Sequence, residues 1–232
     1  MNIIVTGASK GIGFQTVLRL NDNPRNKLVA IARNSDLLTD LKKSGKYPEN
    51  IHPIPFDLKD FFRYKSELLK NILRTIKNVD VLINNAGLLI NKSFETQNEE
   101  DFNLQMEINF KVPFMLTQLL LPYFNPNAHV LNISSMGGVQ GSAKFTGLSA
   151  YSSSKAASAV LTECLAEELK DKEIKSNCLA LGATQTEMLA EAFPGYTAPV
   201  MAADMGKYVA DFAISGHKYF NGKILPVALT TP

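Results

Sequence analysis

The chain has no tryptophan and only two cysteines, Cys164 and Cys178, among its 232 residues. Neither cysteine has a second cysteine or a histidine at the short spacing of a metal site. We therefore expect two buried thiols in a reducing compartment rather than a disulfide framework. His52, His129 and His217 also lack a partner at ligand spacing, and no metal site is predicted.

The sequence also lacks an excess of one charge and a long hydrophobic run. Its 24 lysines and arginines nearly balance 22 aspartates and glutamates, which gives a net charge of +2. This balance does not favour a nucleic acid or an anionic membrane as partner. The best candidate span, Val112 to Leu121, is interrupted by a proline and two polar residues, so we expect a buried helix there.

The first residues, MNIIVTG, already form a β-type run. They leave no room for the charged and apolar regions of a secretory signal peptide. Together with the isolated cysteines, this predicts a cytoplasmic protein.

Short apolar runs alternate with longer amphipathic stretches along the whole chain. The apolar runs are nearly continuous in Val, Ile and Leu, as expected of parallel strands that are covered on both faces. The strands are predicted at Asn2–Thr6, Lys27–Ala32, Ile51–Phe56, Val79–Ile83, Ala128–Ile133, Lys175–Ala180 and Lys223–Val227. The helical patterns include Gly13–Leu20, Phe62–Ile76, Phe102–Leu121 and Ser152–Leu169.

This alternation predicts the α/β class, with a doubly wound parallel sheet of about seven strands and helices on both faces. No linker, repeat or low-complexity segment divides the chain. Because 232 residues, 45 % of them hydrophobic, suit one large core, we expect a single domain over residues 1–232.

A glycine-rich loop follows the first predicted strand and precedes a helix. Glycines let a backbone approach a pyrophosphate, and a helix N-terminus offers free N–H groups. The spacing is GxxxGxG rather than the commoner GxGxxG, so a glycine-rich turn without a ligand remains the alternative. The candidate cofactor residues of this loop are Gly7, Ser9, Lys10, Gly11, Ile12 and Gly13.

The end of the second strand favours NADP(H) over NAD(H). An NAD enzyme commonly places an acidic residue there, against the ribose 2′-hydroxyl. Here the chain reads Ala32-Arg33-Asn34, and a guanidinium suits a 2′-phosphate. Lys10 could reach the same phosphate, although both cations could also be ordinary solvated side chains.

Tyr151 and Lys155 stand four residues apart in a helical pattern, which places them on one helix face about 6 Å apart along the axis. An ammonium group there can lower the pKa of a phenol. To bring the tyrosine pKa from about 10 to about 7 takes roughly 4 kcal/mol and calls for a second positive charge. By itself the pair is a weak motif, because such side chains often only pack together.

Two further motifs occur in order along the chain. Asn84-Asn85-Ala86-Gly87 follows the fourth strand and Ser134-Ser135 follows the fifth, ahead of Tyr151 and Lys155. With the glycine loop, this set resembles the short-chain dehydrogenase/reductase family, from residue 1 to about the last strand. The resemblance implies a Rossmann-type fold and an oxidoreductase that uses a nicotinamide cofactor.

The resemblance assigns four catalytic roles. Tyr151 matches the general acid and base that exchanges a proton with the substrate oxygen. Lys155 matches the lysine that holds the nicotinamide ribose and lowers the tyrosine pKa. Ser135 matches the residue that polarises the substrate oxygen, with Ser134 as the alternative. Asn109 matches the asparagine that holds a relay water behind the lysine, although a mid-helix asparagine can also bond its own backbone.

It also implies further cofactor contacts. Asp57 and Leu58 resemble the pair beside adenine, although Asp57 alone would be read as a helix cap. Asn84 resembles the residue that ties the sheet together beside the cofactor, and Ala86 resembles the one near its ribose. The segment with Thr184 and Thr186 matches the one that holds the nicotinamide carboxamide. The family's usual Pro-Gly before this segment is Leu181-Gly182 here.

The substrate side is predicted to be apolar. Residues 188–203 contain prolines and glycines, and we expect an irregular lid there that closes over the ligand. Leu88, Leu89 and Phe145 are expected nearby, and the lid has no arginine to bind a carboxylate. These observations favour a small or medium neutral carbonyl or alcohol as substrate. Alternatively, the apolar residues could pack against another subunit.

The family resemblance suggests a homodimer or tetramer built on the helices Asn109–Phe124 and Tyr151–Asp171, with a contribution from the last strand. The second helix has more apolar residues than one narrow stripe needs, which agrees with burial on two sides. A non-enzymatic NADP(H)-binding sensor on the same fold is the alternative function. The retention of Asn109, Ser135, Tyr151 and Lys155 together favours the enzyme.

Overall fold

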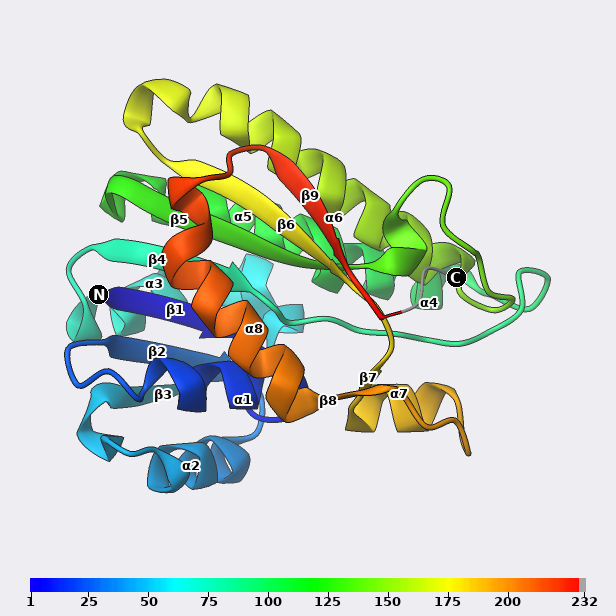
Figure 1. Ribbon diagram of the computed structural model, residues 1–232, viewed down its shortest axis with the longest axis horizontal. Coiled ribbons are helices and arrows are strands. Elements are labelled where there is room, and N and C mark those ends of the chain that lie inside the picture. The colour runs from blue at the N-terminus through cyan, green and yellow to red at the C-terminus, as the bar shows by residue number, and fades with distance from the viewer. Residues whose placement is uncertain (230–232) are drawn as a thin grey trace.

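The computed structural model describes residues 1–229 (Figure 1). A seven-stranded sheet with only parallel pairings runs through it, in the order β3-β2-β1-β4-β5-β6-β9. The strands are β1 Asn2–Thr6, β2 Lys27–Ala32, β3 Ile51–Pro55, β4 Val79–Asn84, β5 Phe124–Ser135, β6 Lys175–Leu181 and β9 Lys223–Val227. The strand order reverses between β1 and β4, and such a point leaves a crevice at the carboxyl ends of the strands.

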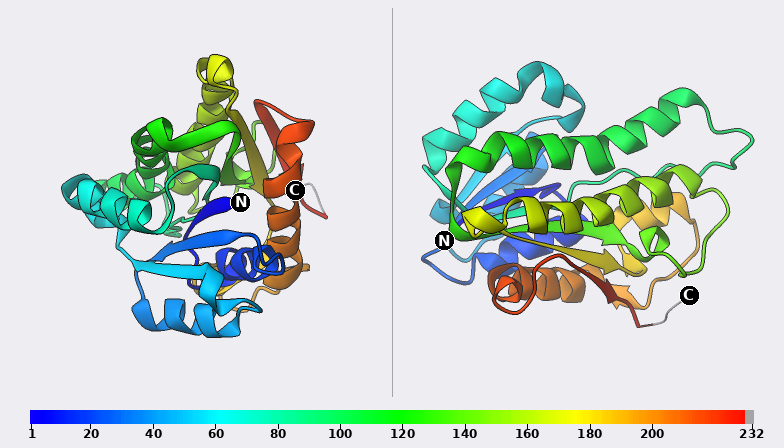
Figure 2. Two further views of the ribbon diagram at one scale, coloured as in Figure 1. Left: turned by 90° about the vertical axis from the view of Figure 1, so that its left-hand side faces the viewer. Right: turned by 90° about the horizontal axis from the view of Figure 1, so that it is seen from above.

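Helices cover both faces of this sheet (Figure 2). The α-helices are α1 Gly11–Leu20, α2 Ser35–Ser44, α3 Phe61–Thr75, α4 Glu99–Met106, α5 Val112–Leu120, α6 Ser149–Glu168, α7 Glu187–Ala192 and α8 Ala202–Ser215. Apolar side chains of α1, α2 and α8 pack on one face, and those of α3 and α5 pack on the other. The predicted fold class is therefore confirmed. No helix within residues 1–229 is long and apolar enough to cross a membrane.

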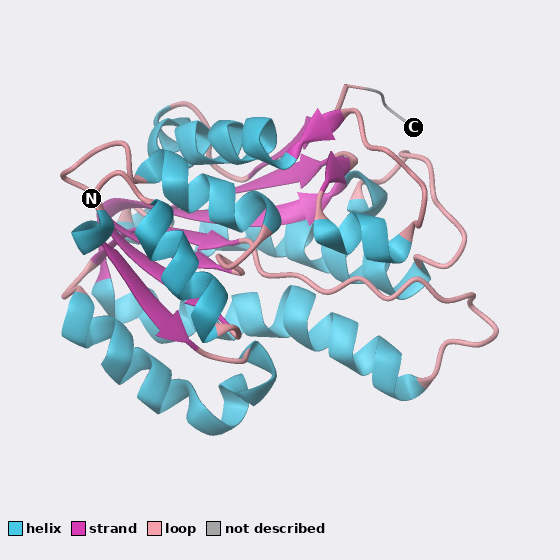
Figure 3. Cartoon of the chain, turned by 90° about the horizontal axis from the view of Figure 1, so that it is seen from below, coloured by secondary structure: helices cyan, strands magenta, loops and turns pink. Residues whose placement is uncertain are grey.

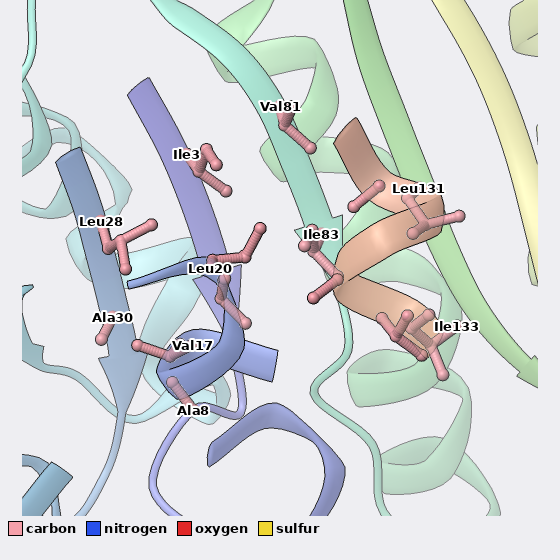
Figure 4. Packing of buried hydrophobic residues seen from close by; sticks show 14 of the residues in the cluster. Ile3, Ala8, Val17, Leu20, Leu28, Ala30, Val81, Ile83, Leu131 and Ile133 are labelled. Carbon is pink, nitrogen blue, oxygen red and sulfur yellow. The ribbon is translucent and has the colours of Figure 1, made fainter. Parts of the chain in front are cut away.

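The two cores take alternate residues of the same strands. In β1, Ile3 and Val5 join the cluster under α1 and α8, whereas Ile4 joins the cluster under α3 and α5. Figure 4 shows Ile3 together with Val17 and Leu20 of α1 in the first cluster. Because both faces are buried, the strands need apolar residues at nearly every position, which explains their continuous hydrophobic runs.

Several elements differ from the sequence predictions. The helices α2 and α8 were not predicted, and the helix expected over residues 102–121 is three pieces, with the π-helical turn Glu107–Lys111 between α4 and α5. The 188–203 lid is not wholly irregular, because it contains most of α7 and the short strand β8 (Val200–Met201), which pairs with β7 (Thr184–Gln185). Short 3-10 turns occur at Pro48–Asn50, Leu58–Asp60, Leu121–Tyr123, Met136–Gly138, Lys170–Lys172 and Gly216–Lys218.

The strands all point towards one side of the molecule, where the longest loops gather (Figure 3). The loops that follow β1, β4, β5 and β6 therefore meet at the same edge of the sheet. This edge holds the sequence motifs described above.

Candidate active site

A pocket of about 640 Å³ lies at the carboxyl edge of the sheet. Its wall draws on the loops after β1 and β4, the ends of β2, β3 and β5, helix α6 and the segment after β6. It brings together most of the predicted residues, namely Gly7, Ser9, Lys10, Gly11, Ile12, Gly13, Arg33, Asp57, Leu58, Ala86, Ser135, Tyr151, Lys155, Thr184 and Thr186. Of the predicted set, only Asn84 and Asn109 do not line it.

The glycine loop has the backbone shape that only glycine adopts without strain. Gly7 and Gly11 have φ angles of +67° and +56°. A Cβ atom on Gly13 would lie 2.3 Å from the Gly7 carbonyl oxygen. No side chain fits at that position, so the loop and the first turn of α1 stay close together and their backbone lines the pocket.

Asn85 and Thr6 hold this loop in place, and both were missed by the sequence prediction. The Asn85 side-chain amide donates hydrogen bonds to the carbonyl oxygens of Thr6 (2.9 Å) and Gly7 (3.2 Å). The Thr6 hydroxyl in turn accepts from the backbone N–H groups of Asn85 (3.1 Å) and Ala86 (3.0 Å). The joint presence of the two motifs after β1 and β4 was the signal that could have revealed this link.

Two cations reach the pocket from neighbouring segments. Arg33 follows β2, is exposed, and makes no salt bridge within residues 1–229. The Lys10 ammonium lies 3.7 Å from a carboxylate oxygen of Glu191 on α7. Asn34 is occupied as the cap of α2, because its side chain accepts from the Leu37 N–H at 2.9 Å. Because β1 and β2 are neighbours in the sheet, the two cations come from adjacent segments of the pocket wall. Lys10 and Arg33 are called the positive corner below.

Asp57 is both a cap of a short turn and a residue of the pocket wall, the two possibilities that the sequence suggested. Its carboxylate accepts a hydrogen bond from the Lys59 N–H at 3.0 Å and so caps the short turn that begins at Leu58. Asp57 and Leu58 also line the pocket at the end of β3.

Tyr151 and Lys155 lie one turn apart near the start of α6. The Lys155 ammonium is 5.9 Å from the centre of the Tyr151 ring and donates a hydrogen bond to the Ile133 carbonyl oxygen at 2.8 Å. Lys155 is only 4 % exposed. Ser135, at the end of β5, lies against Tyr151, and its hydroxyl accepts from the Gly137 N–H at 3.3 Å.

The hydrogen bonds of Ser134 and Ser135 distinguish the roles that the two serines can have. The Ser134 hydroxyl donates to the Lys155 carbonyl oxygen at 2.8 Å, which ties β5 to α6. Ser135 lies beside the tyrosine instead. This arrangement favours Ser135 over Ser134 as the residue that meets a substrate oxygen.

Burial shifts the pKa values of the tyrosine and the lysine in opposite directions. Burial raises the pKa of Tyr151 to about 12, although the hydrogen bond with Ser135 opposes the shift. Burial lowers the pKa of Lys155 to about 8, because an ammonium loses its hydration there. Tyr151 is thus a protonated phenol at neutral pH, in reach of the pocket, and can donate a proton.

Asn109 lies in the π-helical turn and is almost fully buried. Its amide nitrogen donates to the Leu88 carbonyl oxygen (2.8 Å) and to the Ser154 hydroxyl (2.9 Å), and its oxygen accepts from the Leu88 N–H (2.7 Å). These bonds join three segments behind Lys155, rather than closing on the helix's own backbone.

Asn84 lies behind the pocket wall. Its amide nitrogen donates to the Asn132 side-chain oxygen at 2.9 Å, which links β4 to β5. Its own oxygen has no hydrogen-bond partner within residues 1–229. The position agrees with a sheet-tying role and gives no contact with the pocket.

Comparison with known proteins decides the family. A model described as short chain dehydrogenase matches residues 1–197. A 3-oxoacyl-[acyl-carrier-protein] reductase from Thermotoga maritima is 28 % identical over 187 residues, which cover 80 % of this chain and 74 % of that protein. A 3alpha-hydroxysteroid dehydrogenase from Mediterraneibacter gnavus is 31 % identical over 211 residues, 86 % of this chain and 80 % of that one.

The chain belongs to the short-chain dehydrogenase family. The solved structure of a Brucella melitensis 3-ketoacyl-(acyl-carrier-protein) reductase, complexed with NADH, superposes with a TM-score of 0.84 at 21 % identity. That likeness spans 97 % of this chain and 96 % of the other and shows the shared fold. The protein is therefore an oxidoreductase of a family that binds a nicotinamide cofactor.

The residues of this short-chain dehydrogenase fit such a cofactor. The glycine loop exposes its backbone to the pocket without side chains, because a Cβ atom on Gly7 or Gly13 would collide with neighbouring protein atoms. A Cβ atom on Gly87 would approach the Lys155 ammonium to 3.3 Å. The positive corner at Lys10 and Arg33 suits phosphate groups. Hydrophobic side chains line the pocket on the other side, and they are Leu88, Leu89, Met136, Phe145, Leu148, Met188, Leu189, Phe193 and Tyr196.

Proposed function

We propose that this short-chain dehydrogenase transfers a hydride between NADP(H) and a small or medium neutral carbonyl or alcohol. One observation carries the proposal. A single pocket contains the glycine loop, the cations Lys10 and Arg33, and the group Ser135, Tyr151 and Lys155. A phosphate site and a proton donor in one pocket are what a nicotinamide-dependent reductase needs.

Tyr151 supplies the proton in the proposed mechanism. The bound cofactor supplies or accepts the hydride. The Ser135 hydroxyl holds the substrate oxygen beside the Tyr151 hydroxyl, and Tyr151 donates its proton to that oxygen during reduction. In the reverse direction Tyr151 accepts the proton. Positive charge from Lys155 and from an oxidised cofactor would favour the phenolate, against the burial that raises the pKa of Tyr151.

Lys155 and Asn109 support the tyrosine from behind. In this proposal Lys155, which lines the pocket, holds the ribose hydroxyls of the nicotinamide half, as the family resemblance implies. Asn109 fixes the backbone at Leu88 and the helix at Ser154, so that the wall beside the ammonium stays in place.

The preference for NADP(H) rests on Arg33 and Lys10. Both line the pocket, and no acidic residue follows β2 directly, which supports a site for a ribose 2′-phosphate beside them. A guanidinium binds a phosphate through two charge-assisted hydrogen bonds.

The preference for a neutral substrate rests on the apolar wall. No lysine or arginine lines the pocket among residues 188–196, so a carboxylate would lose hydration without gaining a partner. The Mediterraneibacter relative is by name a hydroxysteroid dehydrogenase, and a hydroxysteroid is a largely apolar alcohol, which supports this class.

Three further properties belong to the proposal. The chain acts as one cytoplasmic domain over residues 1–232, with a substrate lid at 188–203. It forms a homodimer or tetramer through α5 and α6. Phe114 and Val160 on these helices are 40 % and 55 % exposed, which supports a contact there.

The test is NADPH consumption over a panel of neutral ketones, aldehydes, quinones and keto esters, with NADH in parallel. The matched variant is Tyr151→Phe, which removes one hydroxyl and keeps the ring. We expect turnover with NADPH that falls at least about 100-fold in the variant, the low end for a lost general acid. Tight NADPH binding without turnover on any substrate would favour the NADP(H)-binding sensor instead.

A further inference from the structure

Asn91 lies where three segments around the substrate side of the pocket meet. The first is the loop 88–92 after β4, which supplies Leu88 and Leu89 to the pocket wall. The second is the loop 136–148 before α6, and the third is α7 with the turn that follows it. Each segment has an apolar side chain that lines the pocket within a few residues of this meeting point.

The Asn91 side chain contacts both of the other segments. Its amide nitrogen donates a hydrogen bond to the carbonyl oxygen of Ala192, the last residue of α7, at 2.9 Å. This carbonyl is one of those that a helix end leaves without an internal partner. The Asn91 side-chain oxygen lies against Gly147, where a Cβ atom would be only 2.0 Å away. Gly147 has a φ of +87°, so both its conformation and its lack of a side chain serve this contact.

The loop that carries Asn91 is firmly anchored on both sides. Leu88 is held by Asn109 through two hydrogen bonds, as described above. The Ile90 N–H donates to the side chain of the fully buried Gln105 at 2.9 Å. The Lys92 N–H donates to the Gly147 carbonyl oxygen at 3.0 Å. Asn91 therefore extends from a fixed base.

The part of the lid formed by α7 and the turn after it, residues 188–196, has few other ties, whereas the later part is held by β8 and by the Ala198 N–H bond to the Gln185 side chain. Within the described chain, the remaining hydrogen bonds of residues 188–196 are local to α7 and the turn after it. Its ion pair, between Lys10 and Glu191, is 3.7 Å long, with side chains 45 % and 75 % exposed. Such pairs contribute little. The Asn91–Ala192 bond is thus the main polar tie between the lid and the substrate side of the pocket.

We propose that Asn91 is a positioning residue that holds α7 closed over the substrate and thereby sets the KM for the carbonyl compound. This inference rests on the proposed function for its kinetic part. Its structural part, the tie between Asn91 and the lid, stands independently of turnover.

The first experiment follows backbone hydrogen exchange in residues 187–196 of the intact protein. Asn91→Ala removes both contacts, and Asn91→Asp keeps an oxygen facing Gly147 but loses the donor to Ala192. Ser93→Ala is the matched control, because the Ser93 hydroxyl contacts only Thr96 nearby. We expect backbone exchange to become about five-fold faster in both Asn91 variants, which corresponds to the free energy of one hydrogen bond. The exchange rate of the Ser93→Ala control should equal that of the wild type. Exchange within two-fold of the wild type in Asn91→Ala would overturn the tie.

The second experiment measures KM and kcat with the best substrate of the panel, and the dissociation constant of NADPH. A lid tie predicts that Asn91→Ala raises KM about five-fold, while kcat and NADPH binding stay within two-fold. A fall in kcat at unchanged KM would overturn the positioning role. If the wild type turns over nothing, the proposed function fails, and the exchange experiment still decides whether Asn91 ties the lid.

Discussion

The two walls of the pocket are held in different ways. On the cofactor side, Thr6 and Asn85 fix the glycine loop through four hydrogen bonds that start from the sheet. On the substrate side, α7 depends on one exposed hydrogen bond from Asn91 and one long, exposed ion pair from Lys10.

This difference separates two tasks. The cofactor wall is preorganised, so little conformational entropy is lost when phosphates bind to it. The lid has few buried contacts and belongs to the low-stability end of the molecule, as segments that open for a ligand do. Changes on the first wall should therefore damage stability or cofactor binding, whereas changes on the second should alter substrate access.

The largest effect is expected from Gly13→Ala. Its Cβ would meet the Gly7 carbonyl oxygen at 2.3 Å and the Asn85 amide at 2.4 Å, and neither can move without breaking the loop. We expect a loss of about 3 kcal/mol in unfolding free energy. Urea unfolding measures it, with Gly141→Ala as control. Gly141 has nothing within 4 Å and only a positive φ, so about 1 kcal/mol is expected there. Equal losses in the two variants would contradict a tightly held loop.

Arg33→Asp should change the affinity for NADPH and leave the other properties of the protein unchanged. The exchange removes a guanidinium from the positive corner and adds a repulsive carboxylate, so NADPH affinity should fall roughly 10- to 100-fold. NADH affinity should stay within about two-fold, because NADH has no 2′-phosphate. Arg25→Asp, another exposed arginine outside the pocket wall, controls for net charge. Equal losses for the two cofactors would contradict the assignment of Arg33.

Acid should weaken the sheet at His129, a residue that no sequence pattern singles out. Its Nδ1 lies 2.9 Å from the Ala213 carbonyl oxygen, and its Nε2 lies 3.1 Å from the Asn177 amide nitrogen. The ring is therefore neutral, and burial lowers the pKa of His129 to about 4. Because the folded state disfavours the protonated ring, this stability is complete above pH 6.5 and is lost as the pH falls towards 4.

The expected loss is about 2 kcal/mol between pH 7.5 and pH 5. Urea unfolding midpoints across that range measure it. His129→Gln should remove most of this pH dependence. His217, whose ring centre is 5.3 Å away, is the comparison variant. An unchanged slope in His129→Gln would show that other groups cause the acid sensitivity.

The smallest effect is expected from Glu191→Gln. It removes an exposed ion pair of 3.7 Å from the lid, so NADPH affinity and KM should change less than about two-fold. Because the loss of Glu191 leaves Lys10 free for a phosphate, any change in NADPH affinity should be an increase. A large rise in KM would show that the ion pair, rather than Asn91, closes the lid.

The strands of the sheet could be predicted, although β5 extends to Phe124–Ser135 beyond the predicted Ala128–Ile133, and the lid could not. Parallel strands buried on both faces leave continuous apolar runs, and the limits of β1, β2 and β9 agree with the prediction. Helix α8 was missed, and Gly206 interrupts its pattern with a poor helix former. The reason for this glycine is spatial: a Cβ on Gly206 would lie 2.4 Å from the Gln15 side chain of α1. No local pattern reveals such a contact.

The residues of the candidate site also divide into those that the sequence predicts and those that it does not. The motif residues that line the pocket were predictable, because most of them follow a strand at its carboxyl end, and Tyr151 and Lys155 share one face of a helix. The residues that hold them, Thr6, Asn85 and Asn91, were not, since their roles depend on bonds between segments far apart in sequence. The π-helical turn at Asn109 was likewise hidden in a stretch that reads as one continuous helix.

The most direct test of the central claim is hydride transfer from NADPH labelled with deuterium at C4 of the nicotinamide. The product alcohols of the neutral carbonyl panel are analysed by mass spectrometry, for the wild type and for Tyr151→Phe. We predict label in the alcohol carbon with the wild type and at least about 100-fold less in the variant. Label at equal rates in both, or none from a folded wild type that binds NADPH tightly, would contradict the account.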